Sequence, residues 1–77
     1  MSNRLNQERE MTLLPKRMEF ALAELKKLGF ETINDKVVIE FIFHGSKVLF
    51  YPYSGWHTGK TIEDGRGWDH LMKQLIN

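Results

Sequence analysis

The sequence predicts a small α+β domain in the order α-β-β-β-α, with a three-stranded antiparallel sheet and two helices packed on one of its faces. Apolar residues recur at steps of three and four near both ends of the 77-residue chain, which is typical of amphipathic helices. Between these segments apolar residues alternate at a period of two, which is typical of strands. The turn signals between the strands are short, and short connections join antiparallel neighbours.

The composition is that of one folded domain without disulfides. Hydrophobic residues make up 42% of the chain, with five Phe and two Trp, which suits a small core. The absence of cysteine excludes disulfides, thiolate metal sites and cysteine nucleophiles. The formal net charge is only +1, so any binding of nucleic acid has to depend on a local basic patch.

The sequence gives no sign of membrane attachment. No apolar run approaches the roughly 20 residues that a membrane-spanning helix needs. The polar start MSNRLNQERE lacks the apolar core of a signal peptide. We therefore expect a cytoplasmic protein that does not contact the membrane.

The first part of the chain divides into a polar arm, residues 1–12, and a helix that opens the single domain, residues 13–77. The arm either frays or extends the helix. Pro15 suits the first helical turn, because its missing N–H has no partner there, and Gly29 suits the helix end. One apolar stripe follows Pro15: Met18, Ala21, Leu22, Leu25 and Leu28.

Three strands are expected next, at residues 30–33, 37–43 and 47–51. His44-Gly45-Ser46 is the turn of a hairpin that joins the last two. The alternation predicts that one set of side chains faces the first helix: Val37, Ile39, Phe41, Phe43, Val48 and Phe50. The opposite face is then unusually apolar, with Val38, Ile42, Leu49, Tyr51 and Tyr53.

The last part of the chain predicts a turn-rich stretch and a second helix. Pro52 ends the third strand, since it cannot donate to a ladder. Thr58-Gly59 is a candidate turn between short runs at residues 55–57 and 60–62. The sequence DGRG at residues 64–67 opens the last helix, whose apolar stripe is Trp68, Leu71, Met72 and Leu75.

Residues 47–67 are the most informative stretch for function, because they combine four of the six glycines with four aromatic rings and a histidine. Tyr51, Tyr53 and Trp56 are suited to stacking on bases, while Lys47, Lys60 and Arg66 are suited to phosphates. The same rings could instead cap a thin core or anchor a protein partner. We predict six ligand-binding residues in this stretch: Tyr51, Tyr53, Trp56, His57, Lys60 and Arg66.

A phosphate-binding loop is excluded, but a looser anion site is not. The sequence GWHTGKT at residues 55–61 is one residue short of GxxxxGK[ST] and lacks the strand and helix that this motif requires. Gly65-Arg66-Gly67 precedes a helix N-terminus, which favours anions, with Lys60, Thr61 and His57 available nearby. The alternative is that both glycines serve a tight turn and that Arg66 is solvated or paired with Glu63 or Asp64.

Nothing in the sequence favours an enzyme or a cofactor. His44, His57 and His70 do not have the mutual spacing of a metal site. Ser54, His57 and Asp64 could be named as nucleophile, base and orienting group of an enzyme with His57 as base, but a catalytic site is recognised by geometry and not by nearness in sequence. We therefore expect no catalytic residues, no metal and no cofactor.

The order of the elements resembles that of double-stranded RNA-binding domains. The Gly-Pro-x-His loop of that family is absent, and the last helix begins GWDH with only Arg66 and Lys73 as nearby cations. The resemblance implies a shared layering of two helices on a three-stranded sheet. It implies none of the family's RNA-contacting residues.

These observations predict a non-enzymatic binding module. The first interpretation is nucleic-acid binding through the aromatic and basic residues of the 47–67 stretch. The alternative is a protein-interaction module or a homo-oligomer that covers the apolar outer face of the sheet. Burial of the three rings inside the monomer would remove the basis for the first interpretation.

Overall fold

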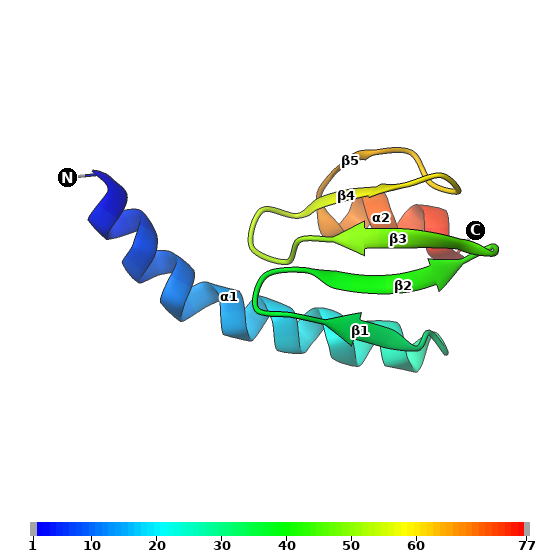
Figure 1. Ribbon diagram of the computed structural model, residues 1–77, viewed down its shortest axis with the longest axis horizontal. Helices are drawn as coiled ribbons and strands as arrows, with labels where there is room; N and C mark the ends of the chain where they lie inside the picture. Colours follow the sequence, from blue (N-terminus) through cyan, green and yellow to red (C-terminus); the bar gives the residue numbers. More distant parts are fainter. Residues whose placement is uncertain (1, 77) are drawn as a thin grey trace.

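The computed structural model describes the backbone of residues 2–76 and the side chains of residues 13–76. It is an α+β fold in which five antiparallel strands follow one another across a single sheet in chain order. Figure 1 shows the two helices behind that sheet, on the same face. The elements are α1 (Ser2–Lys27), β1 (Thr32–Asn34), β2 (Ile39–Phe43), β3 (Ser46–Phe50), β4 (Trp56–Gly59), β5 (Gly65–Arg66) and α2 (Trp68–Ile76).

The prediction of a three-stranded sheet is wrong, because the turn-rich stretch forms two further strands. β4 pairs with β3, where His57 lies opposite Phe50 and Gly59 opposite Val48. β5 pairs with β4 in turn. The predicted hairpin turn at Thr58-Gly59 is also wrong, because both residues lie within β4. Gly59 permits the close pairing, since a Cβ there would lie 3.0 Å from both the Lys47 carbonyl oxygen and the Val48 side chain.

Helix α1 begins earlier than predicted, at Ser2, so Pro15 lies inside it and not in its first turn. Residues 2–10 are mostly good helix formers but carry no apolar stripe, so the sequence pattern does not mark them as part of an amphipathic helix. A proline inside a helix removes one i→i−4 hydrogen bond and favours a kink. In Figure 1 the helix changes direction near its middle, and its first half extends away from the sheet. The backbone of residues 2–12, the described part of the predicted arm 1–12, is therefore helical and continuous with the rest of α1.

The core lies between the sheet and the two helices. The predicted inward set of β2 and β3 is confirmed, whereas Val37 precedes β2 and is exposed. Leu28 is also exposed, because α1 ends at Lys27 and the stripe is no longer helical there. The core residues are Met18, Ala21, Leu25, Ile39, Phe41, Phe43, Val48, Phe50 and Leu71.

The hairpin between β2 and β3 is confirmed. Phe43 pairs with Ser46, so the loop has only His44 and Gly45 at its centre. Both have positive φ, +50° and +82°, as the favoured two-residue turns require. The His44 ring stacks on Phe43 with 3.9 Å between centroids.

Candidate functional site

The uncovered face of the sheet carries the residues that alternate with the core. Ile42 and Trp56 are exposed by 56% and 37%, and Ile33 by 71%. Both helices pack on the other face, so no helix covers these side chains. We call this surface the open face; in β1 to β5 its residues are Ile33, Glu40, Ile42, Lys47, Leu49, Thr58, Trp56 and Arg66. Of the predicted apolar outer face, only Ile42 and Leu49 lie on the strands of the open face, since Val38 precedes β2 and Tyr51 and Tyr53 follow β3. Charged residues interrupt this face: Glu40, Lys47 and Arg66.

Three of the six predicted site residues meet in a hollow at one end of the open face. Trp56 and Arg66 lie directly opposite each other on β4 and β5. With Tyr51 and Ser54 they line a shallow hollow of about 440 Å³. The loop that places Tyr51 beside Trp56 is closed by two hydrogen bonds of 2.8 Å, from Tyr51 N to Trp56 O and from Gly55 N to Tyr51 O. We call these four residues the Trp56 hollow.

His57 lies on the other side of β4 and is completely buried. Its Nδ1 is 3.0 Å from the Gly55 carbonyl oxygen, which can only accept, so Nδ1–H donates. Its Nε2 is then the acceptor for Nδ1–H of His70, at 2.7 Å. The two rings stack with centroids 4.9 Å apart. His57 therefore joins β4 to α2 inside the protein and does not reach a surface ligand.

The electrostatics of this pair keep His57 neutral. Burial lowers the pKa of His57 most, and the neighbouring His70 lowers it further. The hydrogen bond to Gly55 and the charge of Asp64 act in the opposite direction and do not outweigh burial. A neutral His57 with Nδ1–H is also the form that can accept from His70, so geometry and protonation agree.

The glycine corner before α2 is a packed turn. Gly67 has φ of +103°, and its N–H donates to the Gly55 carbonyl oxygen at 3.1 Å. A Cβ on Gly65 would lie 2.8 Å from the His70 ring. Thr61 donates its hydroxyl hydrogen to the Phe43 carbonyl oxygen at 2.7 Å. The Gly67 N–H and the Thr61 hydroxyl therefore donate to acceptors within the protein, which agrees with the alternative that the glycines serve a tight turn. Of the residues predicted for the anion site, Lys60 and Arg66 remain as exposed cations.

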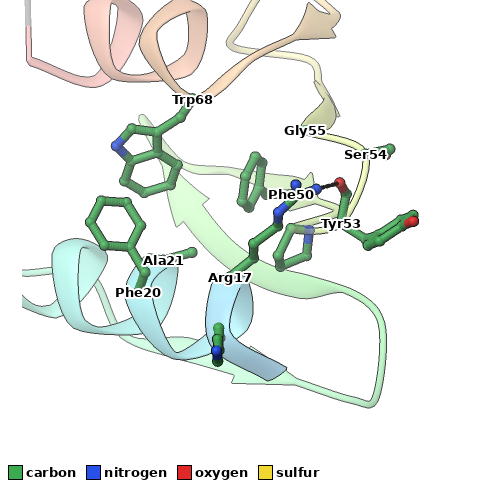
Figure 2. A pocket seen from close by; sticks show the side chains of 10 residues that line it. Arg17, Phe20, Ala21, Phe50, Tyr53, Ser54, Gly55 and Trp68 are labelled. Carbon is green, nitrogen blue, oxygen red and sulfur yellow. Dashed lines mark hydrogen bonds between the residues drawn. The ribbon is translucent and has the colours of Figure 1, made fainter. Parts of the chain in front are cut away.

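Tyr53 is separated from the other two predicted rings and belongs to a second pocket on the helix side. Figure 2 shows this pocket, about 400 Å³, between α1, the loop after β3 and the start of α2. We call it the α1/α2 pocket. Its lining residues are Lys16, Arg17, Phe20, Ala21, Phe50, Pro52, Tyr53, Ser54, Gly55 and Trp68.

Aromatic edges and one guanidinium shape the α1/α2 pocket. The Trp68 ring lies edge-on to Phe20 and Phe50, with centroids 5.3 and 5.4 Å away. Arg17 donates from Nη1 to the Tyr53 carbonyl oxygen, and its guanidinium carbon lies 5.3 Å from the Tyr53 ring centroid (Figure 2). The sequence feature that could have indicated this pocket is an aromatic residue, Phe20, that lies near basic residues and outside the apolar stripe of the helix.

Among the residues that the structure describes, no group of three or more His, Asp or Glu side chains is placed to hold a metal ion. Within residues 2–76 no helix is both long and apolar enough to cross a membrane. Comparisons with models of protein families, with curated proteins and with solved structures found no match. The Trp56 hollow and the α1/α2 pocket are concave surfaces that contain predicted site residues.

Proposed function

We propose that the protein is a non-enzymatic binding module that holds a nucleic-acid strand on the open face of its sheet. The observation that carries the proposal is the Trp56 hollow, where two aromatic rings and a guanidinium line one concavity. Unpaired bases stack on such rings whatever their identity, while cations meet the phosphates. A single strand fits this arrangement because its bases are free to stack.

Each residue of the hollow has a distinct part in this proposal. Tyr51 and Trp56 offer ring faces for successive bases. Arg66 lies beside Trp56 and forms no salt bridge within residues 13–76, so its charge is available to a phosphate. Lys47, on the same face, is 3.4 Å from Glu40 in an exposed pair that a phosphate can replace at little cost.

The other predicted residues contribute less to this surface. His57 is buried and Tyr53 lines the α1/α2 pocket. Lys60 is exposed in the turn that follows β4 and is available for a phosphate further along the strand. The net charge of +1 implies that binding is weak and relies on stacking as much as on charge.

Binding of fluorescently labelled oligonucleotides tests the proposal. Single strands of about 12 nucleotides span a typical site. Trp56→Ala is expected to weaken binding roughly 5- to 100-fold, the range for loss of one stacked base, measured by fluorescence anisotropy. Ile76→Ala, at an exposed position on α2, is the matched control and is expected to bind normally. Equal affinity of the Trp56→Ala variant and the wild type would contradict the proposal.

A second candidate function is a protein partner or a second copy of the chain covering the open face. The favouring observation is the exposure of Ile33 and Ile42, which lie diagonally across β1 and β2. This alternative predicts a solution mass above that of the monomer, or a partner retained at high salt. Ile42→Lys would then restore the monomer mass in light scattering, whereas a monomeric wild type excludes the homo-oligomer.

A further inference from the structure

We propose that the α1/α2 pocket is a second binding site, which takes a small aromatic carboxylate. The ring of the ligand would pack against the contacting rings of Phe20 and Trp68, and its carboxylate would pair with Arg17. This site lies on the helix side of the sheet and shares only Ser54 with the Trp56 hollow. It therefore does not depend on the proposed function of the open face.

The shape of the pocket suits one small planar ligand. Its volume of about 400 Å³ falls within the range of about 300–1,000 Å³ that is typical of small-molecule sites. Ala21 and Phe50 are buried and close its base, whereas Phe20 is 53% exposed at its rim. The lining is mostly apolar with a few polar groups, as in most such sites.

The aromatic groups of the pocket favour a ring over an aliphatic chain. Trp68 already makes edge-to-face contacts with both Phe20 and Phe50. Aromatic pairs in this arrangement are stabilised beyond the area that they bury. Figure 2 shows the rings of Phe20, from α1, and Trp68, from α2, next to each other on one side of the pocket, with Arg17 and Tyr53 on the other. A ligand ring can extend this cluster from the rim inward.

The charge of the pocket selects an anion. Its ten lining residues include two cations, Lys16 and Arg17, and no carboxylate. Arg17 is held in place by its hydrogen bond to the Tyr53 carbonyl oxygen and by the Tyr53 ring. That bond uses one of the five guanidinium N–H donors, so donors remain for a carboxylate. A cation already fixed by the protein loses little side-chain entropy when the ligand binds.

The test uses the full chain labelled with ¹⁵N, whose two tryptophans supply two indole N–H signals in NMR spectra. Indole-3-propionate is the probe, and indole-3-propionamide is the uncharged match. We expect the acid to shift the Trp68 signal saturably and to leave the Trp56 signal in place. The amide is expected to bind roughly three- to tenfold more weakly, because it lacks the charge-assisted pair with a partly exposed cation.

Variants separate a charge contact from a structural role. Arg17→Gln is expected to remove most of the difference in affinity between the acid and the amide, while the affinity for the amide stays unchanged. Lys16→Gln is expected to have a smaller effect on the acid alone. Added NaCl is expected to weaken binding of the acid and not of the amide in the wild-type protein, which tests the charge even if Arg17→Gln fails to fold.

Several results would overturn the proposal. Equal affinities for acid and amide, or equal losses for both in Arg17→Gln, would show that charge does not select the ligand. A shift at Trp56 in place of Trp68 would put the ligand on the open face. A peptide with an internal Trp flanked by Asp, binding more than about tenfold tighter than the free acid, would identify a protein segment as the occupant.

Discussion

Trp56 and His57 are neighbours in β4, and they show how differently the two faces of this sheet are used. His57 points into the core, where both ring nitrogens have partners and burial lowers its pKa. Trp56 points to the open face, exposed by 37% and lying opposite Arg66. The covered face satisfies its polar groups internally, whereas the open face leaves rings and charges available to a ligand.

The largest expected effect comes from matched truncations on the two sides of β2. Ile39 is completely buried and Ile42 is exposed. Ile39→Ala is expected to lower the free energy of unfolding by about 2–5 kcal/mol, since it removes core contacts and leaves a cavity. Ile42→Ala is expected to change it by less than about 0.5 kcal/mol, as at most surface sites. Urea denaturation measures both, and similar losses would mean that the open face is covered in solution.

The pH dependence of stability tests whether His57 is buried and neutral on the covered face of the sheet. The pKa of His57 is lowered in the folded protein, so below the ordinary value of about 6.5 the unfolded chain binds more protons. The free energy of unfolding should therefore be constant above about pH 7.5 and fall as the pH drops below about 6.5, by at most about 1.4 kcal/mol per pH unit for this group. His57→Gln should lose this dependence. A wild-type protein equally stable at about pH 5.5 and 7.5 would contradict the buried neutral ring.

Salt dependence gives the smallest effect and concerns the open face. Arg66→Gln is expected to weaken oligonucleotide binding a few-fold and to reduce the slope of log affinity against log salt by about 1, the contribution of one phosphate contact. Lys73→Gln, at an exposed position on α2, is the control. Unchanged slopes in both variants would remove Arg66 from the phosphate contacts.

The sequence predicted the parts of the fold that have a clear apolar period. The helical stripe of α1 and the alternation in β2 and β3 gave the covered face and its core, including Leu25, Phe41 and Val48. β4 and β5 were missed because they are short, WHTG and GR, and carry no apolar alternation, although each pairs with the strand that precedes it in the chain. Helix α1 was predicted too short, since the sequence of residues 2–12 has no apolar stripe from which to read a helical period.

The candidate site was predicted by nearness in sequence, and this explains where the prediction failed. A period of two in β4 sends Trp56 and His57 to opposite faces, so the predicted six residues could not share one surface. The loop after β3 likewise sends Tyr51 to one hollow and Tyr53 to the other. The α1/α2 pocket was not predicted, because it assembles from three segments far apart along the chain.

The two tryptophans provide the most direct measurement of the central claim, which is that the open face binds nucleic acid. A labelled protein titrated with a single-stranded oligonucleotide gives separate NMR signals for Trp56 and Trp68. We predict that the Trp56 indole signal shifts saturably while the Trp68 signal stays in place. A titration in which Trp56 does not shift, or in which only Trp68 responds, would contradict the claim.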